Sequence, residues 1–147
     1  MIYSPATRVF KTRHFSRWMR KTQLLDAGLC EAVSEMTQGL VDADLGGSVV
    51  KKRVALPGRG KSGGARTLVA TNKVDRWFFL FGFGKSERPN VSAKELQAVQ
   101  AVAADLLKLA SKELDALIGT GALQEICHDR KDPAEEPNPG RGSRDRA

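Results

Sequence analysis

The sequence has no long hydrophobic run and few cysteines, and these shortages exclude several classes of protein. The longest apolar stretch, Trp77–Phe81, is far too short to cross a bilayer. The first residues lack an apolar segment followed by small residues, so we expect no secretory signal. The two cysteines, Cys30 and Cys127, have no Cys-x-x-Cys or Cys/His spacing, which favours free thiols in a reducing cytoplasm. We therefore expect a cytoplasmic protein with no metal, no cofactor and no membrane partner.

Positive charge, by contrast, is abundant and unevenly distributed. The 147 residues carry a formal net charge of +7. Residues 48–88 contain ten Lys or Arg and only two acids, Asp75 and Glu87, whereas residues 26–47 contain acids and no base. A strongly basic segment favours a polyanionic partner, most commonly RNA or DNA. The acidic segment is either an ordinary solvated helix face or a device that orients the molecule.

Hydrophobic periodicity predicts an α+β fold in which an N-terminal helical hairpin and a C-terminal helix pack on a small antiparallel sheet of three to four strands. Apolar spacings of three and four predict helices around Phe15–Met19, after an N-cap at Asp26, and after a capping box at Ser92 and Glu95. The last helix is expected to run on toward Ile118. The predicted strands are Val9–Lys11, Val49–Leu56, Ala65–Thr71 and Trp77–Phe83.

The chain divides into a folded part and a charged end. Residues 1–118 are expected to form one domain with a helical extension, and residues 119–147, which include a charged Pro/Gly-rich run, are expected to be a disordered tail. Trp77–Phe83 is apolar on both of its faces, with Trp77, Phe79, Phe81 and Phe83 on one side, which predicts a central strand covered twice. Lys52 falls on the apolar side of its strand, so we expect it at a rim or in a cleft.

A nucleotide-binding motif is imitated by residues 55–62, ALPGRGKS, with alanine in place of the first glycine. A working P-loop leads from a strand into a helix whose N-terminal amides hold the phosphates. Here Gly63–Gly64 and then the β-rich run Arg66–Thr71 follow. The segment is therefore interpreted as a flexible basic hairpin connection that can wrap a phosphate backbone.

Two segments, KKRVALPGRGKSGGARTLVA and WFFLFGFGKSERPNVSAKELQAV, resemble the RelE/ParE superfamily of bacterial type II toxins, with the HigB-like branch closest. The resemblance covers residues 8–110 and implies the compact α+β fold of that superfamily. Toxins of the RelE/HigB kind are ribosome-dependent endoribonucleases that cut mRNA in the A site, and a cognate antitoxin, in this branch usually a helix-turn-helix protein, neutralises them. The resemblance thus implies an mRNA-cleaving toxin (an mRNA interferase).

The chemistry of RNA cleavage suits a cluster of cations. RNA supplies its own nucleophile, the 2′-OH, so cleavage needs no protein nucleophile and no metal. It needs the phosphate held in line, its extra charge stabilised, one proton removed and another delivered. Arginine can hold two phosphate oxygens at once, and a lysine crowded by cations can act as a base.

The resemblance assigns Arg66, at the start of the second main strand, to the scissile phosphate. The other assignments are interpretations of the basic segment. They are Lys51, Lys52 and Arg53 lining the cleft, with one lysine as the base, Lys85 or Arg88 stabilising the leaving group, and Arg59 and Lys61 gripping the RNA backbone.

The proton donor and the class of activity are left open by the sequence. Some members of the family carry a tyrosine or histidine near the C-terminal end of the site, but this chain has only Tyr3, and His128 lies in the extension. His14 is interpreted as a partly exposed structural histidine because no second motif pairs with it. Two alternatives remain, a non-catalytic ParE-like gyrase poison and a plain RNA- or ribosome-binding module, although the density of cations disfavours the first.

Overall fold

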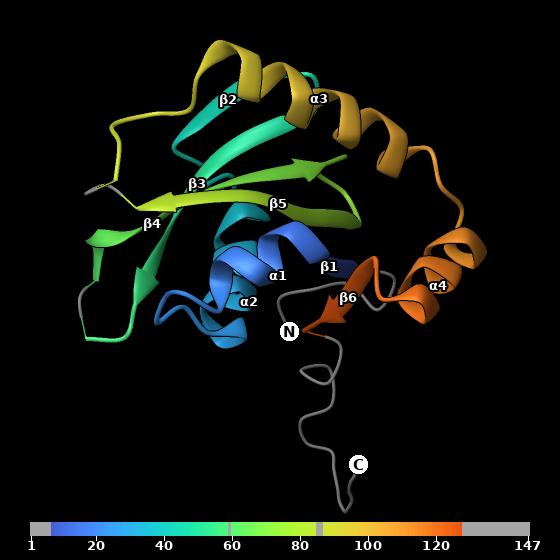
Figure 1. The fold of residues 1–147 in the computed structure, drawn as a ribbon, viewed down its shortest axis with the longest axis horizontal. Helices are drawn as coiled ribbons and strands as arrows, with labels where there is room; N and C mark the ends of the chain where they lie inside the picture. The colour runs from blue at the N-terminus through green and yellow to red at the C-terminus, as the bar shows by residue number, and fades with distance from the viewer. Residues whose placement is uncertain (1–6, 59, 85–86, 128–147) are drawn as a thin grey trace, which may run out of the picture.

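The computed structural model describes residues 7–58, 60–84 and 87–127, with backbone alone at 60–63. Four helices and six strands make up this part of the chain (Figure 1). In order they are β1 (Arg8–Thr12), α1 (Arg13–Met19), α2 (Asp26–Met36), β2 (Ala43–Gly46), β3 (Val49–Leu56), β4 (Gly60–Thr71), β5 (Arg76–Gly84), α3 (Ala93–Leu107), α4 (Ser111–Thr120) and β6 (Leu123–Ile126).

The α+β class is confirmed, but the sheet is larger than predicted and is mixed. Its six strands lie in the order β2-β3-β4-β5-β1-β6. Strands β2 to β5 form an antiparallel meander, and β1 pairs with β5 in parallel because the two helices of the hairpin carry the chain from β1 to the far edge. Strands β2 and β6 were not predicted because each has only four residues and contains no apolar run that would indicate a strand.

The sheet is covered on both faces, as Figure 1 shows (α1 and α2 on one side, α3 on the other). Fifteen-residue α3 packs with α4 over a core that includes Phe10 and Phe78, whereas α1 and α2 pack over a second core that includes Phe15 and Phe79. Strand β5 contributes to both cores, which confirms that it is central and doubly covered.

One face assignment along β5 is wrong. The register between β4 and β5 shifts between Leu68 and Val69, so Leu68 lies opposite Phe81 while Val69 lies opposite Phe79. As a result Phe81 packs with the α3 core and does not share the face of Phe79. A β-bulge changes which side chains share a face, and nothing in a two-residue alternation reveals where it occurs.

The helix ends follow the sequence in part. Ser92 caps α3, and Glu95 completes the predicted capping box. Asp26 is the first helical residue of α2 rather than its N-cap, which is Leu25. The long C-terminal helix is broken at 108–110, and α4 and β6 occupy residues 111–126, so the predicted tail begins too early. Residues 128–147 lie outside the described residues.

No helix in the described ranges has the length and apolar character that a membrane span requires.

The two cysteines are joined, which contradicts the expectation of free thiols. Cys30 on α2 and Cys127, just after β6, form a disulfide across 97 positions of sequence. Strand β6 pairs with β1 so that Ile126 lies opposite Val9, and this pairing brings Cys127 to the α2 side of the sheet. No local pattern predicted this disulfide, because it depends on strand β6, which was not predicted.

We expect reduction of this disulfide to lower the free energy of unfolding by about 2–5 kcal/mol, because the bridge closes a long loop in the unfolded chain. The measurement is urea unfolding with and without a thiol reductant. The matched control is the double variant Cys30→Ala/Cys127→Ala, whose unfolding should be insensitive to the reductant. Equal stability of the oxidised and reduced wild-type protein would contradict the expectation.

Gly82 allows α1 to approach β5 closely. A Cβ atom at Gly82 would overlap the ring of Trp18, which packs against the α1–α2 core. We expect Gly82→Ala to displace Trp18 and to destabilise the protein by about 1–3 kcal/mol, which is the usual effect of overpacking. Thermal unfolding followed by circular dichroism measures this loss. Gly119→Ala in α4 is the control: its Cβ would meet nothing within 4 Å, so stability should stay level or rise. Similar losses in both variants would refute the role of the Trp18 contact.

Candidate functional site

Three neighbouring strands bring cations and aromatic rings together on the α3 side of the sheet. Arg53 in β3 lies opposite Arg66 in β4, and Arg66 lies opposite Phe83 in β5. The next row along the strands consists of Lys51, Leu68 and Phe81. Because side chains alternate between faces, residues two apart on each strand point the same way. The two rows therefore form one surface, which α3 leaves uncovered at its N-terminal end.

Arg88 completes this surface from the segment after β5. Its guanidinium lies over the rings of Phe81 and Phe83, 5.6 and 5.8 Å from their centroids. It also forms an ion pair of 2.6 Å with Glu95 at the start of α3. The hydrogen bond from the Ser92 backbone, and then that from Arg88, hold the pKa of Glu95 below its usual range. Arg88 is thus fixed above the aromatic rings, with 39% of its side chain exposed.

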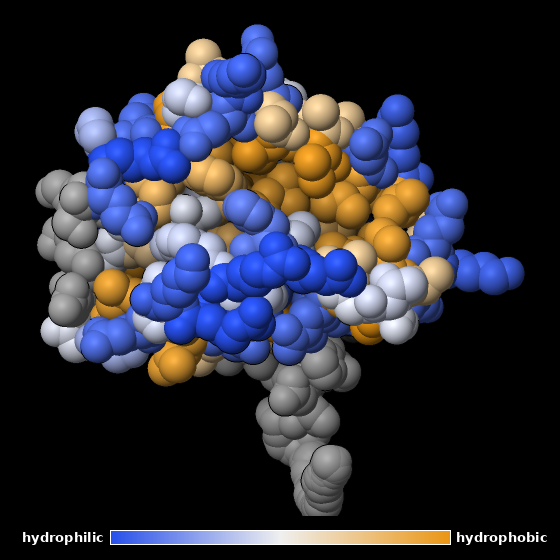
Figure 2. All heavy atoms as spheres, in the orientation of Figure 1, coloured by the Kyte–Doolittle hydropathy of each residue, from blue (hydrophilic) through white to orange (hydrophobic). Residues whose placement is uncertain are grey.

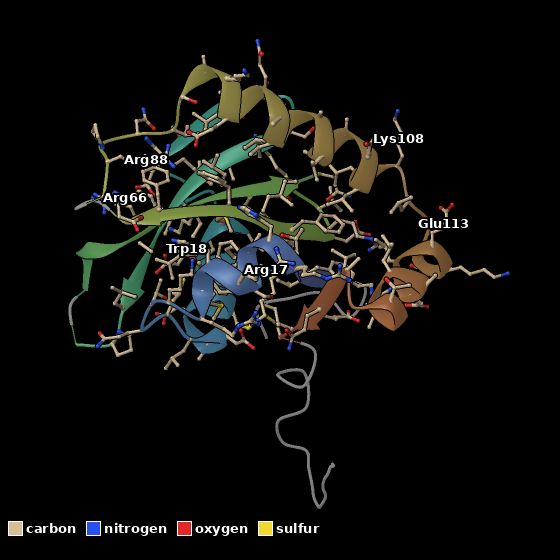
Figure 3. The ribbon with its side chains drawn as sticks, in the orientation of Figure 1. Arg17, Trp18, Arg66, Arg88, Lys108 and Glu113 are labelled. Atoms are coloured by element: carbon tan, nitrogen blue, oxygen red, sulfur yellow. A yellow bond between two sulfur atoms is a disulfide. The ribbon has the colours of Figure 1, made fainter. Side chains whose placement is uncertain are left out.

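Arg66 and Lys51 are available to a ligand. Arg66 is half-buried, and its guanidinium donates to the carbonyl oxygen of Gly64 at 3.2 Å. The Lys51 ammonium donates to the side-chain oxygen of Asn90 at 3.5 Å. In the described part of the chain neither cation forms an ion pair with an acidic side chain. Figure 3 places Arg66 and Arg88 at the same end of the sheet.

Arg53 shares this surface, but its charge is already paired. Its backbone N–H and its guanidinium both donate to the carboxylate of Asp42, the latter at 3.0 Å. Burial raises the pKa of Asp42, but these hydrogen bonds and the charge of Arg53 outweigh it, so the pKa lies below its usual value. Arg53 is therefore held at the edge of the sheet beside β2.

Lys52 does not belong to the site. It points to the opposite face of the sheet, where it is 4% exposed. Its ammonium forms an ion pair of 2.8 Å with Glu35 of α2 and donates to the carbonyl oxygen of Leu40 at 2.8 Å. The prediction of a rim or cleft position is wrong because α2 supplies a carboxylate that lets the lysine be buried. Lys52 therefore cannot line the cleft as the sequence suggested.

Helix α1 lines one side of a groove at the site, which sequence patterns did not predict. A groove of about 540 Å³ separates α1 from the end of β5, and it is lined by His14, Arg17, Trp18, Lys21, Phe81, Gly82, Phe83, Glu87 and Arg88. Figure 3 shows Arg17 and Trp18 on α1, with Trp18 nearer the end of the sheet that carries Arg66 and Arg88. Arg17 and Lys21 form no ion pair within the residues described. The basic side chains of α1 thus face the same groove as Arg88.

The imidazole ring of His14 stacks on Phe81, with ring centroids 5.9 Å apart and planes within 9°. His14 is exposed and also borders an apolar hollow of about 360 Å³ beneath α3, whose walls include Leu80, Val99 and Val102. Figure 2 shows this apolar surface beneath α3, with hydrophilic surface along α1 below it. No sequence motif paired with His14, but in the fold its ring contacts Phe81.

Three predicted residues cannot be placed. Arg59 and Lys85 lie outside the described residues, and the side chain of Lys61 does also. The segment that imitates a P-loop leads into strand β4 and not into a helix. Because β4 already begins at Gly60, the predicted flexible connection is shorter than expected. Among the described side chains, no three His, Cys, Asp or Glu residues gather as a metal site requires.

Two comparisons with known proteins bear on this site. The family described as "RelE toxin of RelE / RelB toxin-antitoxin system" matches residues 7–126. The match extends through α4 and β6, beyond the limit at residue 110 that the sequence motifs suggested, so those elements are part of the family domain. No curated protein sequence matches the chain. Because the family match covers most of its length, the chain belongs to the RelE toxin family, within the RelE/ParE superfamily, and membership implies a cognate antitoxin.

Proposed function

We propose that this protein is a toxin that cuts mRNA on the ribosome as a metal-independent endoribonuclease, and that it belongs to the HigB-like branch. The observation that carries the proposal is the convergence of Arg66, Arg88 and Lys51 from separate segments on one open surface. Two of these cations lack an acidic partner among the described residues. Unpaired arginine and lysine are the groups that stabilise a phosphate as its charge increases.

Each residue has a role in this reaction. Arg66 holds the scissile phosphate, because its fork matches two phosphate oxygens and it stands on the central strand of the site. Arg88 stabilises the leaving 5′-oxygen from above Phe81 and Phe83. Lys51 adds positive charge on the β3 side, and Arg17 and Lys21 contact the RNA backbone from α1. Arg59 and Lys61 remain proposed contacts to the RNA backbone, and Lys85 remains the proposed alternative to Arg88 at the leaving group.

The aromatic residues of β5 support a nuclease over a plain binding module. Phe78 and Phe79 are fully buried in the two cores, and Phe83 is 1% exposed beneath Arg88. A module that binds single-stranded RNA presents aromatic rings on its surface so that bases can stack on them. Here the rings of Phe78 and Phe79 pack in the cores, and that of Phe83 lies beneath a cation, which suits a site that acts on a phosphate.

The proposal predicts mRNA cuts at the ribosomal A site when the purified protein is added to a translation reaction. Primer extension on the translated mRNA locates these cuts, and a parallel assay measures supercoiling by DNA gyrase. A-site cuts support the proposal. Loss of supercoiling without cuts would identify a ParE-like gyrase poison, and RNA or ribosome binding without either effect would identify a binding module. A helix-turn-helix antitoxin is the expected partner, and it should abolish the cuts.

A further inference from the structure

The proposed site has cations for the phosphate but no assigned group to take the proton from the 2′-OH. Lys52 is buried in an ion pair with Glu35, so it cannot accept that proton. Lys51 remains on the surface, where its ammonium contacts Asn90. A base near neutral pH is most simply supplied by histidine, the side chain that ordinarily changes charge between pH 5 and 8.

His14 is the histidine that the described structure places at this site. Its ring stacks on Phe81, and Arg88 lies over the same phenyl ring, so the three side chains are contiguous. His14 is the second residue of α1, and this helix is capped by Thr12, whose hydroxyl accepts from the backbone N–H of Phe15 at 3.1 Å. The backbone that carries His14 is therefore fixed, while the imidazole borders the 540 Å³ groove.

His14 lies on the α1 side of the proposed phosphate site. The row Lys51, Leu68, Phe81 crosses three strands, so Lys51 and Phe81 are separated by two strand spacings, roughly 10 Å. His14 lies against Phe81 at the other end of that row, and the middle strand carries Arg66. A phosphate held by Arg66 would thus have His14 on its α1 side and Lys51 on its β3 side.

We infer that His14 is the general base of the proposed cleavage; this inference rests on the proposed function. The unprotonated ring nitrogen accepts the 2′-OH proton while the 2′-oxygen forms a bond to the adjacent phosphorus. The bond between phosphorus and the 5′-oxygen breaks, and that oxygen leaves with its electron pair next to Arg88 and takes a proton from water. The products are a 2′,3′-cyclic phosphate and a 5′-hydroxyl.

The charged groups that face His14 come from each element around it. They are Arg17 and Lys21 on α1, Glu87 and Arg88 after β5, and Glu95 on α3. Both acids are engaged elsewhere: Glu95 pairs with Arg88, and the Glu87 carboxylate accepts from the backbone N–H of Gly84 at 2.7 Å. The imidazole therefore faces three cations, and both carboxylates near it are already bound.

The test is single-turnover mRNA cleavage on translating ribosomes with the variants His14→Ala and His14→Phe. His14→Phe keeps a ring to stack on Phe81 but has no nitrogen to accept a proton. We expect both variants to lose about 10²–10⁴-fold in rate, the usual contribution of general base catalysis, while binding to ribosomes is unchanged. The matched control is His128→Ala, the second histidine, whose rate should equal that of the wild type.

Rescue by added imidazole separates proton transfer from a structural role. It should restore activity to His14→Ala but not to His14→Phe, whose ring fills the space. Retention of activity in either variant, or a rate loss in His14→Ala that imidazole does not rescue, would overturn the assignment of His14 while leaving the nuclease intact. Absence of cleavage by the wild-type protein in the same assay would instead overturn the proposed function itself.

Discussion

Replacing Arg66 with alanine is expected to lower the rate of mRNA cleavage by about 10²–10³-fold, the usual cost of removing one preorganised donor to a developing negative charge. Arg66 stands on the central strand of the site, opposite both Arg53 and Phe83. Its guanidinium is held at the Gly64 carbonyl, and no acidic side chain of the described residues competes for its charge. Single-turnover cleavage on ribosomes measures the loss.

Arg53→Ala is the matched control for this prediction. Arg53 lies next to Arg66 on the same face, yet its charge is neutralised by Asp42. Removal of Arg53 should therefore change the cleavage rate much less than removal of Arg66. Arg66→Lys keeps the charge but loses the fork that holds two phosphate oxygens, so it should rescue little of the rate. Equal losses at positions 53 and 66 would mean that general positive charge, rather than a placed phosphate ligand, explains activity.

The sequence predicted the central part of the fold because that part is encoded locally. Strands β3 and β5 and the capping box of α3 appear where apolar periodicity and Ser92 placed them. The edge strands β2 and β6 were missed because short strands are stabilised by pairing with a neighbour, and the neighbour is distant in sequence. The Cys30–Cys127 bridge was missed for the same reason, since it follows from β6.

The gathering of cations at the candidate site was predictable from the sequence, but the full set of residues around them was not. A basic segment with arginines indicated a phosphate ligand, and the register of β3, β4 and β5 does bring Lys51 and Arg66 together. Strand alternation also placed Lys52 on the other face, but no sequence pattern showed that Glu35, seventeen positions earlier, would pair with it there. His14 joins the groove only through the packing of α1 against β5, which sequence spacing does not report.

The burial of Lys52 leads to the second large expected effect. Lys52→Ala should lower the free energy of unfolding by about 3–5 kcal/mol, because it removes the ammonium that pairs with the Glu35 carboxylate in a mostly buried setting. The carbonyl oxygen of Leu40 would lose its donor as well. Urea unfolding measures the change. Lys51→Ala, one residue away and half-buried on the opposite face of the strand, is the matched control and should shift stability by no more than about 0.5 kcal/mol.

A hydrophobic replacement of the whole pair separates stability from catalysis at this position. Lys52→Met/Glu35→Leu removes both charges together, so its stability should lie within about 1 kcal/mol of the wild type or above it. Because the pair lies on the α2 side of the sheet, away from Arg66 and Arg88, this double variant should cut mRNA at the wild-type rate. Lys51→Ala should show the reverse pattern, with stability kept and cleavage slowed. A stable double variant that no longer cuts mRNA would show that Lys52 takes part in the reaction. The position of a lysine on one or the other face of β3 would then not distinguish a structural role from a catalytic one.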